Sequence, residues 1–130
     1  MSRVPALVAM HADLAAALIR AAARVYGPVD DVEVLSNEGL SRDALERAIA
    51  ERVSGWREGG LVFTDFWGGS CNLCAASVAR GRGEVVVLSG LNLPTFLDYL
   101  HNRDQLRVDE LADRLLQKGR ESIRLQRAAS

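Results

Sequence analysis

The chain has 130 residues, of which 48% are hydrophobic and 25% are charged, a balance that indicates one globular domain over residues 1–130 rather than a disordered tail. Its formal net charge of −1 argues against nucleic acid as the partner, because binding to a phosphate backbone favours a basic surface. No apolar run approaches the roughly 18 residues that a membrane span needs, so direct membrane insertion is not expected.

The cellular location follows from the N-terminus and the cysteines. The chain does not begin with the basic start, apolar stretch and cleavage site of a signal peptide. Two cysteines, Cys71 and Cys74, are too few for the disulfide framework of a small secreted protein. We therefore expect a cytoplasmic protein.

Apolar runs and helical spacing predict the elements along the chain. In order, they are a strand at 4–10, a helix at 12–26, a strand at 32–35, a helix that Ser41 opens and that reaches Trp56, a strand at 61–64, a helix at 70–80, a strand at 84–88, two helices at 95–102 and 107–118, and an edge strand at 122–125. Strands that alternate with helices predict an α/β domain of three layers, with a mostly parallel sheet and helices on both faces. The last strand would add an antiparallel edge.

Ligands of such sheets bind beyond the carboxyl ends of the strands, where the strand order switches. His11 follows the first predicted strand, and Asp65 follows the third. Gly68, Gly69 and Ser70 then open a helix. If the first and third strands are neighbours, we expect these residues to meet in one crevice.

These residue types suit the transfer of an anionic group. A neutral imidazole is a nucleophile, and a carboxylate on one ring nitrogen leaves the other nitrogen free to attack. Glycines and a helix N-terminus present backbone amides to an anion. The pattern therefore predicts a phosphoryl group carried on His11, oriented by Asp65, in a scheme that needs no metal and no cofactor.

Three motifs extend this prediction to nearly the whole chain. They are Met10-His11-Ala12-Asp13-Leu14-Ala15 after the first strand, Thr64-Asp65-Phe66-Trp67-Gly68-Gly69-Ser70-Cys71 after the third, and Gly90-Leu91-Asn92-Leu93-Pro94 after the fourth. In this order the motifs resemble those of the IIA component of the mannose-type (mannose/fructose/sorbose) sugar phosphotransferase system.

The resemblance implies a phosphotransferase with a phosphohistidine intermediate. His11 matches the phosphorylated histidine of the family and Asp65 its paired carboxylate. Gly68, Gly69 and Ser70 match the turn that binds the phosphoryl group. By the same resemblance, the donor is the small carrier HPr, the acceptor is a IIB component, and the IIC/IID membrane permease is served indirectly. Family members commonly form homodimers, some of which exchange their last strand.

The sequence departs from the family pattern at four positions. Met10 replaces a hydroxyl residue before the histidine, and Ala12 replaces the glycine after it. Cys71 replaces a proline, and Asn72 lies one position from the family's asparagine. The nucleophile and its carboxylate are retained. The sugar, and whether the output is transport or regulation, stay open.

Other functions compete with this one. Cys71 and Cys74 form a C-x-x-C at a helix start, which is typical of a thiol-redox site. Together with His11 and His101 they could supply four zinc ligands. A regulatory phosphorelay not coupled to transport, or a binding module without phosphotransfer, is a further alternative. Trp67, inside the second motif, could pack or could shape a partner surface.

Overall fold

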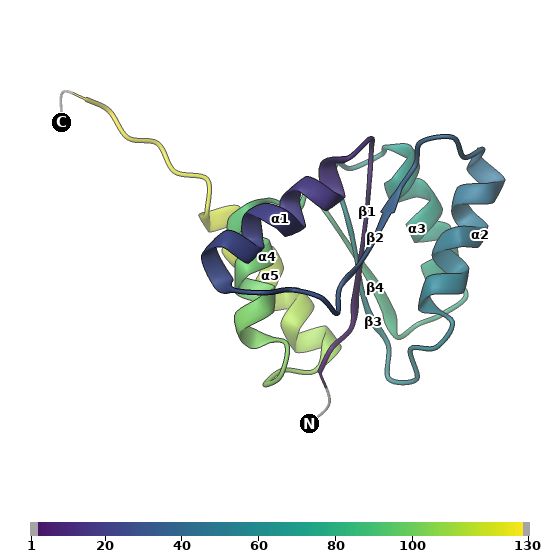
Figure 1. The fold of residues 1–130 in the computed structure, drawn as a ribbon. Helices are drawn as coiled ribbons and strands as arrows, with labels where there is room; N and C mark the ends of the chain where they lie inside the picture. The colour runs from purple at the N-terminus through teal and green to yellow at the C-terminus, as the bar shows by residue number, and fades with distance from the viewer. Residues whose placement is uncertain (1–2, 129–130) are drawn as a thin grey trace.

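The computed structural model describes residues 3–128, in which four strands alternate with five helices (Figure 1). The strands are β1 (Ala6–Met10), β2 (Glu33–Ser36), β3 (Gly60–Thr64) and β4 (Val85–Ser89). The helices are α1 (Leu14–Tyr26), α2 (Arg42–Val53), α3 (Ser70–Arg80), α4 (Leu93–Asn102) and α5 (Val108–Glu121). Each lies close to a predicted element.

All four strands run parallel in one sheet, with the order β2-β1-β3-β4. β1 therefore lies between β2 and β3, and its last residues pair with the ends of both: Ala9 with Thr64, and Met10 with Ser36. The chain adds β2 on one side of β1 and β3 on the other, so the switch in strand order lies between β1 and β3. The predicted α/β class is confirmed, and the first and third strands are neighbours, which is the condition under which His11 and Asp65 were expected to meet.

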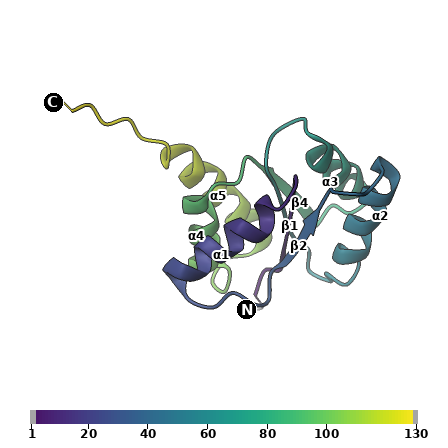
Figure 2. The ribbon, with the colours of Figure 1, turned by 45° about the horizontal axis from the view of Figure 1, so that its top comes forward.

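Helices cover both faces of the sheet and produce three layers (Figure 2). α1, α4 and α5 lie on one face, and α2 and α3 on the other. Successive residues of β1 enter opposite cores: Val8 and Met10 contact the first, Leu7 and Ala9 the second. Burial on both faces is why the strands lack polar alternation.

The Gly-x-Asn-x-Pro motif builds the start of α4. The Asn92 side chain accepts a hydrogen bond from the Thr95 amide at 3.0 Å and so caps the helix, and Pro94 occupies its first turn, where a missing amide costs nothing. The Asn92 side chain also donates to the Ser122 hydroxyl at 3.0 Å. This residue therefore joins the start of α4 to the end of α5.

The end of α5 differs from the prediction. The helix predicted at 107–118 would stop before Gly119, but α5 continues through this glycine to Glu121. A Cβ at Gly119 would lie 2.7 Å from the Thr95 hydroxyl. The glycine is therefore needed for the close approach of α5 to α4, and it does not end the helix.

The edge strand predicted at 122–125 is wrong for this chain by itself. No strand follows α5 within residues 3–128, and the segment extends away from the domain (Figure 1). Ile123 is 81% exposed and Leu125 77% exposed. Their apolar side chains favour a strand, but the segment points away from the sheet and meets no strand of its own chain with which it could pair.

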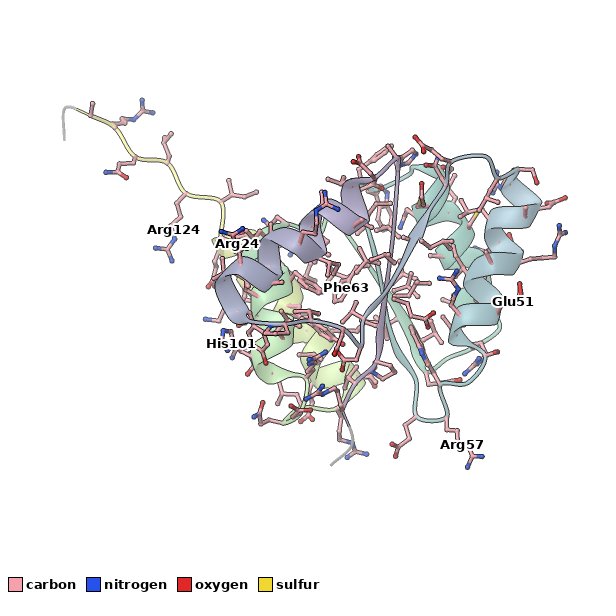
Figure 3. All side chains as sticks on the ribbon, in the orientation of Figure 1. Arg24, Glu51, Arg57, Phe63, His101 and Arg124 are labelled. Atoms are coloured by element: carbon pink, nitrogen blue, oxygen red, sulfur yellow. The ribbon has the colours of Figure 1, made fainter. Side chains whose placement is uncertain are left out.

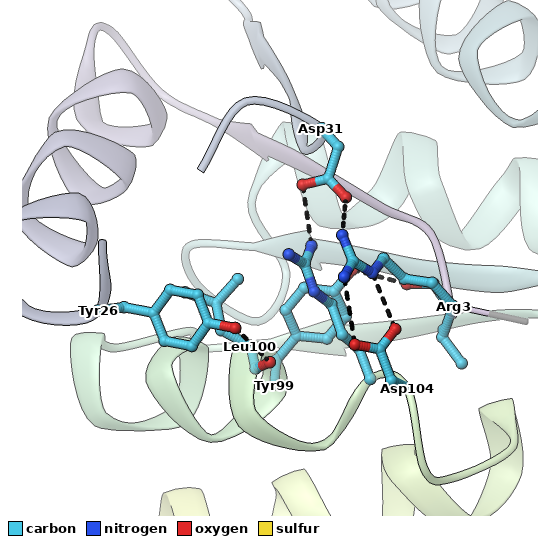
Figure 4. A network of polar contacts seen from close by, with 8 residues as sticks. Arg3, Tyr26, Asp31, Tyr99, Leu100 and Asp104 are labelled. Atoms are coloured by element: carbon cyan, nitrogen blue, oxygen red, sulfur yellow. Dashed lines mark hydrogen bonds and ion pairs between the residues drawn. The ribbon is translucent and has the colours of Figure 1, made fainter. Parts of the chain in front are cut away.

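A network of charges joins the loops at the amino ends of the strands (Figure 4). Arg3 donates to Asp31 at 2.7 Å and to Asp104 at 2.8 Å. Arg103, only 4% exposed, donates to Asp31 at 3.0 Å and lies over the ring of Tyr99. These contacts connect the segment before β1 with the loops that follow α1 and α4.

The side chains follow the usual separation of apolar interior and charged surface. Phe63 lies inside the layer formed with α1, α4 and α5, whereas Glu51, Arg57 and Arg124 project outward (Figure 3). Every helix within residues 3–128 is too short or too polar to span a bilayer.

Candidate functional site

The structure places the predicted site residues at the switch point of the sheet. His11 follows directly after β1, Asp65 follows directly after β3, and Ser70 is the first residue of α3. Because β1 and β3 are adjacent, the residues that follow them share one crevice at the carboxyl edge. The spatial arrangement expected from the strand order is present.

Asp65 holds His11 by two hydrogen bonds to one oxygen atom. Its Oδ2 accepts from the His11 backbone amide at 2.9 Å and lies 2.8 Å from the ring Nδ1. Its Oδ1 accepts from the Phe66 amide at 3.1 Å. Burial opposes ionisation of Asp65, but the hydrogen bonds from His11 outweigh it and lower the pKa of the carboxyl. An ionised carboxylate can only accept, so Nδ1 carries the proton and Nε2 has the free electron pair.

Ser70 and the start of α3 face that free nitrogen. The Ser70 hydroxyl lies 3.3 Å from His11 Nε2. The first hydrogen bond of the helix runs from the Leu73 amide to the Gly69 carbonyl, so the amides of residues 70–72 have no partner within the helix. The side chain of His11 is 37% exposed, which leaves Nε2 open to a partner, whereas that of Asp65 is only 9% exposed.

The two glycines shape the turn instead of supplying free amides. Gly68 has φ +87°, and its amide donates to the Asn72 side chain at 2.9 Å. The Gly69 amide donates to the Phe66 carbonyl at 3.3 Å, and a Cβ on Gly69 would lie 2.6 Å from the Phe66 ring. Both amides are thus already hydrogen-bonded within the turn. Of the three residues predicted to bind the phosphoryl group, Ser70 has the geometry best suited to it.

Two further side chains, not predicted from the sequence, lie at the site: one contacts the His11 ring, and the other bonds the residue after it. The Phe66 ring lies against the imidazole with centroids 5.2 Å apart. Asn37 follows β2, and its side chain accepts from the Ala12 amide at 3.1 Å. The rule that located His11 and Asp65, inspection of the residue after each strand, would have reached Ser36 after the strand predicted at 32–35, because β2 ends one residue later, at Ser36, and Asn37 follows it.

Trp67, the neighbour of Phe66, is 85% exposed. A side chain of this size has little role in packing at that exposure. Of the two interpretations of Trp67, a partner surface is therefore the better supported.

The C-x-x-C pair lies in the wrong environment for redox chemistry. Cys71 and Cys74 are both buried and both unpaired. Burial, with Asp65 nearby, raises the pKa of the Cys71 thiol to about 11, and burial also raises the pKa of Cys74. Reactive thiols need the opposite, an exposed site that lowers the pKa.

The zinc hypothesis also loses two of its four ligands. Among residues 3–128, the one group of side chains close enough to share a metal ion is His11, Asp65 and Cys71, whose ligand atoms lie within 4.8 Å of one another. Cys74 is outside this group, and His101 instead packs against Tyr26 on the far end of α4. Asp65 is already engaged by His11, so the arrangement suits a hydrogen-bonded pair better than a metal.

Comparison with known sequences identifies the group of proteins that this chain resembles. The model of the EIIA-man family, described as PTS system fructose IIA component, matches residues 6–116. The chain is 29% identical over 113 residues to the PTS system sorbose-specific EIIA component of Klebsiella pneumoniae, an alignment that covers 86% of this chain and 84% of that relative.

Solved structures show the same fold. The phosphotransferase system component EIIA from Streptococcus agalactiae superposes with a TM-score of 0.87 at 21% identity, over 94% of this chain and 96% of that one. The mannose/sorbose specific IIA subunit from Enterococcus faecalis gives a TM-score of 0.84 at 19% identity, over 97% and 96%. These similarities cover nearly the whole chain and are similarities of fold.

Proposed function

The chain belongs to the mannose-type EIIA family of the sugar phosphotransferase system, and from this we propose that it is a cytoplasmic phosphocarrier that works through one IIA domain over residues 1–130. In this proposal His11 accepts a phosphoryl group from phospho-HPr and passes it to a IIB component. The observation that carries the proposal is the Asp65 carboxylate on Nδ1 of His11, which leaves Nε2 free beside Ser70.

The reaction is an in-line displacement at phosphorus. The electron pair of His11 Nε2 attacks the phosphorus of phospho-HPr, the Nε2–P bond forms, and the N–P bond of the donor breaks with its electron pair returning to the donor imidazole. Asp65 keeps the proton on Nδ1 and stabilises the positive charge that the phosphorylated ring acquires. Transfer to the IIB component repeats the same exchange in the opposite direction.

The start of α3 supplies the charge stabilisation. Phosphoryl transfer depends mainly on positioning and on stabilising the three equatorial oxygens. In this proposal the Ser70 hydroxyl, 3.3 Å from Nε2, donates to the phosphoryl group, and the N-terminus of α3 adds a favourable field. Gly68 and Gly69 contribute by allowing the turn that brings Ser70 to His11. The scheme uses no metal and no cofactor.

Phosphate incorporation tests the proposal. The protein is incubated with phosphoenolpyruvate, enzyme I and HPr, and its intact mass is measured before and after mild acid. We expect one acid-labile phosphoryl group, absent from His11→Ala and present in His101→Ala, which controls for the other histidine. A folded wild-type protein that stays unmodified while HPr is phosphorylated would contradict the proposal.

Transfer to the IIB component separates transport from regulation. A transport role requires rapid passage of the phosphoryl group to a IIB component and, through it, to sugar entering by the IIC/IID permease. The regulatory phosphorelay uses the same chemistry on His11 but has no IIB acceptor. Loss of the phosphoryl group from the phosphorylated protein when cognate IIB is added favours transport, and its retention favours the regulatory phosphorelay.

We also propose that the protein forms a homodimer. β4 is one of the two edge strands of the sheet, and an apolar groove of about 520 Å³ runs beside it, lined by Val85, Val86, Val87 and Trp67 among others. The segment after α5 exposes Ile123 and Leu125 and points away from its own domain (Figure 1). Pairing of this segment with β4 of a second copy would cover both surfaces, as strand exchange does in the family.

A further inference from the structure

We propose that Asn37 is a positioning residue for phosphoryl transfer, because it fixes the backbone on both sides of His11. The inference rests on the proposed function, in that the reaction it supports is the transfer on His11. The contacts that carry it are independent of that function and can be tested in the unmodified protein.

Asn37 is hydrogen-bonded to the residue before His11 and to the residue after it. Its amide donates to the Met10 carbonyl at 3.3 Å, and its side-chain oxygen accepts from the Ala12 amide at 3.1 Å. Asp65 accepts from the His11 amide between them. Three consecutive residues are thus held from the two strands that flank β1, with Asn37 at the end of β2 and Asp65 at the end of β3.

The backbone after His11 needs this support. Ala12 has φ +52°, the one positive φ among the non-glycine residues of the described chain, 3–128. A residue with a Cβ is disfavoured in this left-handed region, which glycine enters freely. The Asn37 side chain stabilises the Ala12 amide in the orientation that this conformation requires. If it is removed, Ala12 can return to a negative φ and turn the His11 ring away from Ser70.

Asn37 itself is well placed to act as a fixed support. It begins a turn closed by a hydrogen bond from the Leu40 amide to its own carbonyl at 3.1 Å, and Gly39 in that turn has φ +74°. The Asn37 backbone therefore does not depend on Ala12. Its side chain is the part that reaches across to the strand carrying His11.

Kinetics of phosphorylation by phospho-HPr test the proposal with four variants. Asn37→Ala should lower the rate constant for phosphoryl transfer about tenfold, which corresponds to about 1.4 kcal/mol in activation free energy. The concentration of phospho-HPr that gives half the maximal rate should change little. Ala12→Gly should restore most of that loss in the double variant, because glycine adopts the positive φ unaided, and Ala12→Gly alone provides the reference. Glu38→Gln, an exposed neighbour in the same loop, should match wild type.

NMR of the unphosphorylated protein gives a readout that does not depend on transfer. A positive φ at Ala12 produces a strong intraresidue amide–Hα NOE, and Nδ1–H of His11 gives a distinct ¹⁵N tautomer signature. Both should weaken in Asn37→Ala. Both should persist in Asn37→Asp, which keeps an acceptor oxygen and serves as the second variant if Asn37→Ala does not fold.

The outcomes separate this inference from the proposed function. A slower Asn37→Ala that Ala12→Gly rescues supports it, as does a weakened NOE. An unchanged rate and NOE in Asn37→Ala, or a loss that Ala12→Gly does not rescue, overturns it. If the wild-type protein accepts no phosphoryl group, the proposed function fails, and the NMR comparison alone still decides whether Asn37 holds Ala12.

Discussion

Within the site, a single oxygen atom of Asp65 accepts hydrogen bonds from both the backbone and the ring of His11. The backbone contact fixes where the residue sits, and the ring contact fixes which nitrogen carries the proton. The second oxygen accepts from the Phe66 amide. Both oxygens of the carboxylate therefore act as acceptors for N–H groups. A neutral amide at this position cannot reproduce the pattern, because one of its two terminal atoms is a donor.

Asp65→Asn should therefore slow phosphorylation of His11 on the order of 100-fold without unfolding the domain. With its NH₂ group toward His11, the new amide meets the backbone N–H and favours the wrong ring tautomer; with its NH₂ group toward Phe66, it meets the Phe66 amide, which is also a donor. The measurement is the rate of phosphoryl uptake from phospho-HPr, with thermal unfolding as a check on the fold. Asp13→Asn, an exposed carboxylate beside the site, is the matched control. An Asp65→Asn protein with the wild-type rate would remove this residue from the mechanism.

The cysteines give a second prediction about single residues. Because Cys71 and Cys74 are buried and their pKa values are raised, that of Cys71 to about 11, neither should react with a thiol reagent such as Ellman's reagent in the native protein at neutral pH. Both should react on unfolding in denaturant. Rapid reaction of either thiol in the folded protein would revive the redox alternative.

Among the elements, the segment after α5 is the one that we propose to pair with a second copy of the chain. A lone strand cannot satisfy its own backbone, and within residues 3–128 this segment has no strand beside it. The start of the segment is held in place, because the Ser122 hydroxyl donates to the Gly119 carbonyl at 2.7 Å and accepts from the Asn92 side chain. The segment is thus anchored at its base and open along its length.

Ile123→Asp and Leu125→Asp should each weaken the proposed dimer on the order of tenfold, since each removes about 1.5 kcal/mol of apolar burial. Analytical ultracentrifugation over a range of concentrations measures the dissociation constant. Gln126→Ala, in the same segment but without an apolar side chain to lose, should leave it unchanged. A wild-type protein that is monomeric at high concentration, or variants that dimerise as it does, would contradict the strand-exchange proposal.

The charge network at the amino ends of the strands makes a prediction about stability. Asp31 is held by Arg3 and by the buried Arg103, and although burial opposes its ionisation, these two partners lower its pKa. Asp31→Asn should cost about 1–3 kcal/mol of unfolding free energy at neutral pH, because Arg103 loses a charged partner in a buried position. Asp30→Asn, an exposed neighbour, is the control.

The pH dependence of that difference follows from the lowered pKa. A depressed carboxyl pKa gives stability that is complete above the unfolded value, near 3.8, and is lost as the pH falls through the folded value. The gap between wild type and Asp31→Asn should therefore be constant near neutrality and shrink in the acid range below 3.8. Denaturant unfolding across this range measures it, and a gap independent of pH would show that the Asp31 charge is not the cause.

For the molecule as a whole, the features that could be predicted from the sequence are those set by local residue pattern, namely the strands, the helices and the residues that follow each strand. Apolar runs such as Val85–Leu88 identified the strands. His11 and Asp65 each follow directly after a strand, so they were expected to lie together if those two strands were neighbours, which they are. What escaped prediction depends on contacts between distant segments. The role of Gly119 needed the approach of α5 to Thr95, and the role of Asn37 needed the pairing of β2 with β1 together with a positive φ at Ala12.

The failure at 122–125 has a different cause. Its alternating apolar residues have a real preference for extended structure, and sequence pattern cannot say whether the pairing strand lies in the same chain. The roles of Gly68 and Gly69 in the site turn also could not be predicted from residue type alone. Their identity suggested free amides for an anion, but the structure uses those amides within the turn.

In the proposed reaction, Nε2 of His11 carries the phosphoryl group while Asp65 holds Nδ1. It is tested most directly by ¹⁵N and ³¹P NMR of protein labelled with ¹⁵N at histidine and phosphorylated by phosphoenolpyruvate, enzyme I and HPr. We expect one phosphoramidate, with ³¹P coupled to Nε2 of His11, a proton retained on Nδ1, and no change at His101. Coupling to Nδ1, attachment to His101, or the absence of any phosphoramidate would contradict it.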